Sequence, residues 1–104
     1  MSDILVKFDE AITDSTGSKY FARAVGRERE DGLWEGCLEF LPLDTTRETV
    51  SSGRETTQPN RKTLEYWAQG LTRVYLMGAL DRARRSTPAI ERERQAFDTA
   101  RRAP

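Results

Sequence analysis

The chain has 104 residues, a size that suits one domain with one hydrophobic core. Its 17 Lys and Arg residues balance its 17 Asp and Glu residues, so it lacks the strongly basic net charge that is typical of a nucleic-acid-binding domain. It has no histidine and one cysteine, Cys37, which excludes an intrachain disulfide, Ser-His-Asp or Cys-His catalysis, and imidazole or paired-cysteine metal sites.

The charge is unevenly placed along the chain. Residues 82–104 hold seven Arg and three acidic residues, a net of +4, whereas residues 1–81 carry 10 basic and 14 acidic groups, a net of −4. Such a tail can contact an acidic partner or nucleic acid, or it can be a solvated helix of mixed charge. The first ten residues, MSDILVKFDE, do not resemble a secretory leader, and no apolar run could span a membrane. We therefore expect a soluble, cytoplasmic protein.

Alternating side chains predict three strands in the first half of the chain. Ile4–Ile12 is the first, with Ile4, Val6 and Phe8 on one face, and Asp14–Ser18 is a turn. Tyr20–Glu28 and Leu33–Leu41 follow as the second and third strands.

The loop between the second and third strands predicts their register. Glu30-Asp31-Gly32 fits a three-residue loop closed by Gly32 in the left-handed region, which pairs Arg29 with Leu33. This register sets opposite charges across the ladder, Arg27 by Glu35 and Arg23 by Glu39. A two-residue loop would instead place Glu28 opposite Glu35, and like charges oppose pairing.

The same register gives the sheet two different faces. One carries large residues over small ones, namely Trp34, Leu38 and Phe40 over Ala22, Ala24, Gly26 and Gly36. This face is expected to receive a helix. The other alternates Arg and Glu and adds apolar surface from Phe21, Val25, Cys37 and Leu41. It is expected to be half-solvated, or partly covered by a partner.

The second half of the chain predicts an edge strand and a helix. Arg47–Thr57 is polar and Thr-rich, as edge strands are, and Gly53 marks a bulge. Asn60 is a good N-cap, and from Arg61 to about Arg85 the apolar residues follow helical spacing. A short peripheral helix over residues 88–102 then begins at Thr87-Pro88. The fold class is therefore α+β: a four-stranded antiparallel meander with one long helix packed on one face, in a domain of residues 1–85 with an Arg-rich appendage, 86–104.

Two segments of this chain resemble a family of small bacterial proteins that have no assigned function. They are the hairpin Asp31-Gly32-Leu33-Trp34-Glu35-Gly36 and the run Glu55–Ala83, ETTQPNRKTLEYWAQGLTRVYLMGALDRA. The resemblance extends from about Ile4 to Ala83. It implies one compact domain that ends near Ala83, and it implies no activity.

The helix entrance is a candidate anion site. Helix N-termini present unpaired N–H groups and a positive dipole. Two hydroxyls, the capping amide and two cations surround this one: Thr56, Thr57, Asn60, Arg61 and Lys62. The alternative is an ordinary strand-to-helix junction capped by Asn60. The cationic first turn is unfavourable for the helix dipole, which keeps the anion site open as a hypothesis.

Two other site types have less support. Aromatic residues beside Arg could stack on single-stranded nucleic acid, but the set Trp34, Phe40, Tyr66, Trp67 and Tyr75 falls mostly on faces expected to be buried. For catalysis, the sequence has no nucleophile elbow, P-loop or metal-ligand cluster. Acidic residues are plentiful (Glu35, Glu39, Glu55 and Glu65), but Glu35 and Glu39 face Arg. Cys37 is expected to be a packed small hydrophobe. We expect no enzyme, and no cofactor, metal or membrane partner.

The function that the sequence favours is a small interaction module that binds a second copy of itself. Gly70, Val74 and Gly78 would form a smooth line on the long helix, able to lie on Gly26 and Gly36 or on another copy. The candidate interface residues are Gly70, Val74, Gly78, Phe21, Val25 and Leu41. The alternative is a nucleic-acid or anion-binding module that uses Asn60–Lys62 and the Arg-rich tail.

Overall fold

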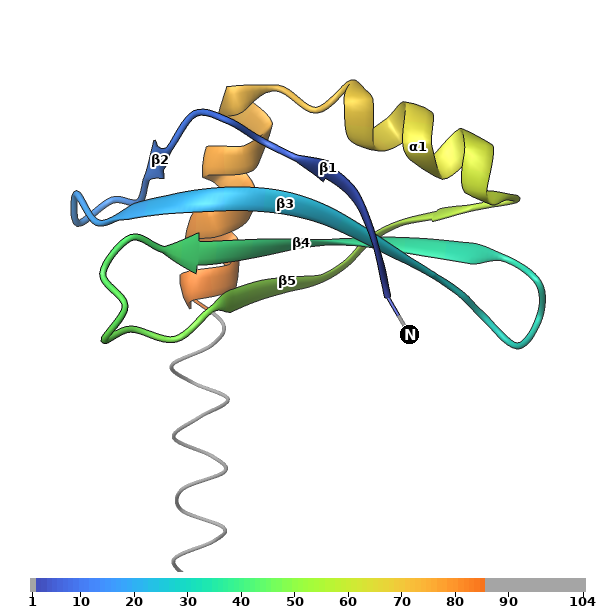
Figure 1. The fold of residues 1–104 in the computed structure, drawn as a ribbon, viewed down its shortest axis with the longest axis horizontal. Coiled ribbons are helices and arrows are strands. Elements are labelled where there is room, and N and C mark those ends of the chain that lie inside the picture. The colour runs from blue at the N-terminus through green and yellow to red at the C-terminus, as the bar shows by residue number, and fades with distance from the viewer. Residues whose placement is uncertain (1, 86–104) are drawn as a thin grey trace, which may run out of the picture.

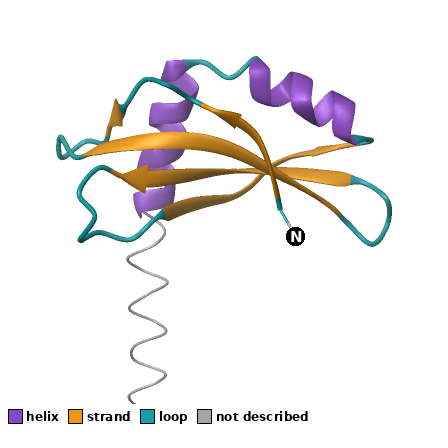
Figure 2. Ribbon diagram, in the orientation of Figure 1, coloured by secondary structure: helices purple, strands orange, loops and turns teal. Residues whose placement is uncertain are grey.

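The computed structural model describes residues 2–85 of the chain. These residues form an antiparallel sheet of five strands with two helices, which confirms the α+β class (Figures 1 and 2). The strands are β1 (Asp3–Lys7), β2 (Ile12–Thr13), β3 (Lys19–Glu28), β4 (Trp34–Pro42) and β5 (Val50–Gln58). Side by side in the sheet, their order is β1-β3-β4-β5. The short strand β2 pairs with the first residues of β3, ahead of the stretch of β3 that pairs with β1. The helix expected over residues 88–102 lies outside the described residues.

The first predicted strand is divided in two, and its alternation is interrupted. A register shift between Ile4 and Val6 opposite β3 is a bulge at Leu5. Ile4 pairs with Val25, on the face away from the core, whereas Leu5 and Val6 both pack against the core. The expectation that Ile4, Val6 and Phe8 share one face is therefore wrong for Ile4, because the bulge resets the period-two pattern.

The hairpin between β3 and β4 has the register that the charges predicted. Arg27 lies opposite Glu35 and Arg23 opposite Glu39. The Arg29 N–H donates to the Leu33 carbonyl at 2.7 Å, which closes the three-residue loop. Gly32 has φ 84°, the left-handed conformation that this loop requires.

The long helix predicted from Arg61 to Arg85 is in fact two helices. Helix α1 covers Arg61–Gln69 and ends at Gly70, whose N–H donates to the carbonyls of Tyr66 and Trp67 at 3.1 and 3.2 Å. A second helix covers residues 73–85, and the Thr72 hydroxyl accepts from the Tyr75 N–H at its start. Gly70, Val74 and Gly78 therefore do not lie on one helical line.

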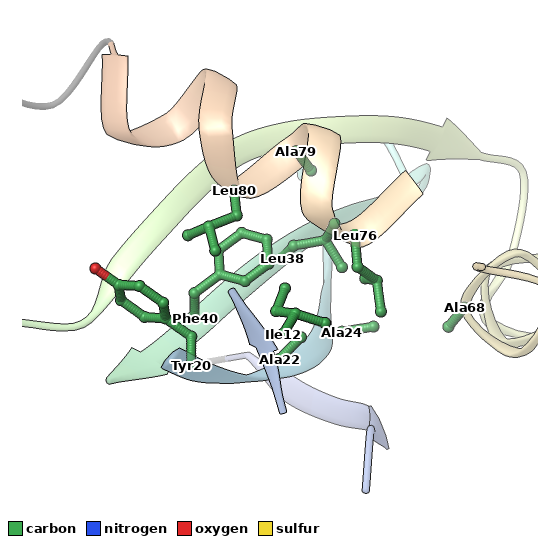
Figure 3. Packing of buried hydrophobic residues seen from close by; sticks show 10 residues of the cluster. All are labelled: Ile12, Tyr20, Ala22, Ala24, Leu38, Phe40, Ala68, Leu76, Ala79 and Leu80. Atoms are coloured by element: carbon green, nitrogen blue, oxygen red, sulfur yellow. The ribbon is translucent and has the colours of Figure 1, made fainter. Parts of the chain in front are cut away.

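Each helix covers a different part of the same sheet face. Leu64 and Trp67 of α1 lie on Gly26 and Gly36, which are paired across β3 and β4. A Cβ on Gly26 would come within 2.5 Å of Leu64, and one on Gly36 within 2.7 Å of Trp67. These two side chains, not the predicted Gly70 line, make the close approach. The second helix crosses behind β3, β4 and β5 (Figure 1) and places Leu76 and Leu80 against Leu38 and Phe40 of β4 (Figure 3).

Strand β5 begins three residues later than predicted and is irregular. Two register shifts interrupt its pairing with β4. At one, Gly53 has φ 73°, and the Ser52 hydroxyl replaces a ladder carbonyl by accepting from the Leu38 N–H at 3.0 Å. At the other, Glu55 is the extra residue between Arg54 and Thr56. This second bulge turns the Glu55 carboxylate toward the second helix.

Candidate functional site

The sheet has one face that no described element covers, and we call it the open face. Its residues follow from the strand pairing, since partners in a ladder share a face. Within the strands they are Ile4, Lys7, Thr13, Lys19, Phe21, Arg23, Val25, Arg27, Glu35, Cys37, Glu39, Leu41, Ser51, Arg54 and Thr57. Three of the six predicted interface residues, Phe21, Val25 and Leu41, lie together here.

Two ion pairs cross the middle of the open face. Arg23 Nε lies 2.6 Å from a Glu39 oxygen, and Arg27 Nε hydrogen-bonds the buried carboxylate of Glu35. Each carboxylate is therefore neutralised by the Arg on the neighbouring strand. Cross-strand pairs of this kind hold the register of β3 on β4.

Apolar side chains lie in alternate rows between these pairs. Ile4 is 46 % exposed and Phe21 43 % exposed, although both are paired with a neighbouring strand. Leu41 beside Phe21 and Cys37 beside Val25 continue the apolar rows. Apolar groups left in water on one contiguous face are a common property of binding surfaces.

A shallow hollow of about 530 Å³ lies on this face, over Val25 and Cys37. Arg27, Glu35, Glu39 and Arg54 stand around it. Burial raises the pKa of the Cys37 thiol, and the Glu35 carboxylate raises it further. The thiol is therefore protonated at neutral pH and is a poor nucleophile, which fits a packing role.

The helix entrance is built as a capped junction. The Asn60 side chain accepts from the Thr63 N–H at 2.9 Å, as an N-cap does. Arg61 Nη1 lies 2.5 Å from an Asp3 carboxylate oxygen, and Arg61 Nε lies 3.0 Å from a Glu65 carboxylate oxygen. The guanidinium group also stands over the Trp34 ring. Hydrogen bonding to Glu65 and the charge of Asp3 raise the pKa of Arg61. Its charge is compensated inside the protein.

The remaining residues of the predicted anion site do not converge. Thr56 faces the helices and accepts from the Gln58 amide at 2.8 Å, whereas Thr57 lies on the open face. Lys62 is exposed on α1. Asn60, Arg61 and Lys62 are neighbours only along the chain, and the two threonines lie on opposite faces of the sheet.

The predicted helical interface line is also dispersed. Gly70 caps α1, and Val74 is 81 % exposed in the first turn of the second helix. A Cβ on Gly78 would meet only Arg82, at an ordinary 3.6 Å.

The structure contains two polar clusters that the sequence did not predict. Glu55 accepts from the Tyr75 hydroxyl at 2.7 Å and from Arg82 at 2.9 Å, and Arg82 stands over the Tyr75 ring. Burial raises the pKa of Tyr75, and the contact with Glu55 adds to this. The cluster fastens the second helix to the edge of the sheet. Only the bulge at Glu55 brings these residues together, and no local pattern signals it.

The second cluster surrounds the side chain of Asp14, which is only 1 % exposed. One oxygen accepts from the Thr16 hydroxyl at 2.7 Å and from the N–H groups of Thr16 and Ser18. The other oxygen lies 2.9 Å from Arg84, which also donates to the Tyr20 hydroxyl. Burial acts to raise the pKa of Asp14, but these hydrogen bonds and the Arg84 charge outweigh it, so the pKa is lowered. Arg84 is therefore engaged within the fold.

No family model, curated protein or solved structure matches this chain. The resemblance to a family of small bacterial proteins stays a prediction. Neither helix within residues 2–85 is long and apolar enough to cross a bilayer. The same residues contain no group of three acidic or cysteine side chains that could hold a metal ion.

Proposed function

We propose that this chain is a non-enzymatic interaction module that binds another polypeptide through the open face of its sheet. The observation that carries the proposal is the exposure of Ile4 and Phe21 on a sheet whose described helices both pack on the opposite face. Covering these side chains would remove apolar surface from water, which is the main favourable contribution in most protein associations.

The dimensions of the open face fit such a role. Strand β3 has 10 residues, and at about 3.4 Å per residue and about 4.8 Å between strands the four-strand face measures roughly 34 by 19 Å. Its flat area of roughly 650 Å² is close to the roughly 800 Å² that each partner contributes to a stable interface. A two-fold homodimer through this face is one such complex, and it stays a prediction.

The other functions considered have less support from the geometry. Anion binding at the helix entrance would compete with the contacts of Arg61 to Asp3 and Glu65. Catalysis at the hollow would need a free acid or a reactive thiol, whereas Glu35 is paired and the Cys37 thiol has a raised pKa.

Site-specific photo-cross-linking in the cells that make the protein tests the proposal. A cross-linking amino acid replaces Phe21 on the open face or, as the matched control, Tyr66, an exposed aromatic on α1. We expect a discrete adduct from position 21 and none from position 66. An adduct of twice the mass of the chain would identify a second copy. No adduct at position 21, or equal adducts at both positions, would contradict the proposal.

A further inference from the structure

We infer that the occupant of the open face is a segment of another protein that carries acidic as well as apolar side chains. This inference rests on the proposed function of that face. It goes further by naming the chemistry of the partner, and it follows from how the structure distributes charge.

The open face and the rest of the molecule carry opposite net charge. Within the strands, the open face has five cations (Lys7, Lys19, Arg23, Arg27 and Arg54) and two carboxylates (Glu35 and Glu39), a net of +3. The other described residues have eight cations and twelve carboxylates, a net of −4. The chain is neutral as a whole, so this segregation cannot be seen in its composition.

The charges on the open face are arranged with a neutral middle and a cationic margin. Arg23 forms an ion pair with Glu39, and Arg27 forms one with Glu35. The other three cations of this face, Lys7, Lys19 and Arg54, have no ion-pair partner among the described residues. Lys7 and Arg54 stand on the two outer strands, and Lys19 stands at the start of β3. An apolar middle with a charged rim is the usual anatomy of a protein interface, and the rim selects the partner.

This arrangement favours an acidic protein segment over three other occupants. A second copy bound face to face would bring two net positive surfaces together, which costs affinity. Residues 86–104 hold four Arg and three acidic residues, so they have the same sign of charge as the face. Single-stranded nucleic acid needs a row of stacking aromatics, whereas Phe21 is the one aromatic within the strands of the open face.

Titration of the full, isotope-labelled chain with three defined probes tests the inference. The probes are a short peptide in which Glu alternates with Leu, the same peptide with Lys for Glu, and an oligothymidylate of equal length. We expect the Glu peptide to shift the amide signals of β3 and β4 and to bind at least about tenfold more tightly than the Lys peptide. Its affinity should fall as salt is raised, because the rim charges are exposed.

Charge reversal then locates the binding surface. The variant Lys7→Glu/Lys19→Glu/Arg54→Glu should weaken binding of the Glu peptide by at least about tenfold. The control variant Arg47→Glu/Lys62→Glu/Arg85→Glu changes three exposed cations outside the open face and should leave the affinity within about twofold. Thermal unfolding of both variants shows whether they are folded.

The outcomes separate this inference from the proposed function. A cross-link from position 21 with equal binding of the Glu and Lys peptides would overturn the inference and leave the interaction module standing. A cross-link to a second copy, tighter binding of the oligothymidylate, or equal loss in both triple variants would also overturn it. Absence of both the cross-link and any peptide binding would remove the proposed function itself.

Discussion

The contact of α1 with the sheet predicts that Gly36→Ala destabilises the protein. A Cβ at this position would lie 2.7 Å from Trp67, 2.8 Å from Leu64 and 3.2 Å from Thr56, whereas an ordinary contact is 3.4 Å or more. Leu64 is fully buried, and the indole of Trp67 is rigid, so α1 must move outward by several tenths of an ångström.

Two opposing effects set the size of the change. Overpacking a well-filled core costs about 1–3 kcal/mol. Replacing glycine by alanine within a strand returns about 0.5–1 kcal/mol, because the unfolded chain loses conformational freedom. We therefore expect a net loss of about 1–2 kcal/mol in the free energy of unfolding, and a fall in Tm of roughly 4–8 °C for each kcal/mol in a domain of this size.

Gly78→Ala is the matched control with the opposite sign. Gly78 lies inside the second helix, and its Cβ would meet only the end of Arg82 at 3.6 Å. Alanine should stabilise here by about 0.5–1 kcal/mol through helix propensity. Urea unfolding followed by circular dichroism measures both variants, with the slope m checked for constancy.

A double-mutant cycle with Leu64→Ala identifies the cause. Truncating Leu64 alone should cost about 2–5 kcal/mol, but less in the Gly36→Ala background, where the new methyl group fills part of the cavity. A coupling energy of at least about 0.5 kcal/mol is expected. If Gly36→Ala is as stable as the wild type, or the coupling is absent, the close seating of α1 on the sheet is wrong.

Three further predictions follow from single contacts. Asn60→Ala removes the cap of α1 and should cost about 1 kcal/mol in urea unfolding, whereas Thr57→Ala, on an exposed position nearby, should change stability by less than about 0.5 kcal/mol. The folded pKa of Asp14 is lowered, so its charge contributes stability above the ordinary aspartate pKa, and this contribution is lost as the pH falls through the lowered value. The stability advantage of the wild type over Asp14→Asn should therefore be full at pH 7 and shrink below about pH 4; an unchanged difference would contradict the role of the charge. Alkylation of Cys37 should be slower at neutral pH than that of free cysteine and should accelerate only at alkaline pH, which mass spectrometry can follow.

The sequence predicted those features that local chemistry determines. The register of β3 on β4 followed from the loop at Gly32 and from matching Arg23 and Arg27 with acidic partners, because a one-residue slip would oppose like charges. The small residues Gly26 and Gly36 marked the face that receives a helix. The Asn60 cap was also correct, since N-caps depend on neighbouring residues alone.

The sequence predicted the bulge at Gly53 but not the other positions where regular patterns are interrupted. Apolar spacing continues through Gly70–Thr72, so periodicity favoured one helix, although Gly70 and Thr72 carry ordinary stop and start signals. Bulges at Leu5 and Glu55 interrupt the alternation of side chains between the two faces of the sheet, and no residue type in the sequence marks these positions. Partners distant in sequence, such as Asp14 and Arg84, are fixed by the complete fold, and so is the charge segregation of the open face.

The break between the two helices divides the cover of the sheet into two parts, which we expect to open separately. Leu64 and Trp67 close the part over Gly26 and Gly36, and Leu76 and Leu80 close the part over Leu38 and Phe40. Because the short segment Gly70–Thr72 joins the two helices, we expect α1 to detach in a local opening while the second helix stays in place. Amide hydrogens of α1 would then exchange at a rate of their own, and the sheet would keep its open face throughout.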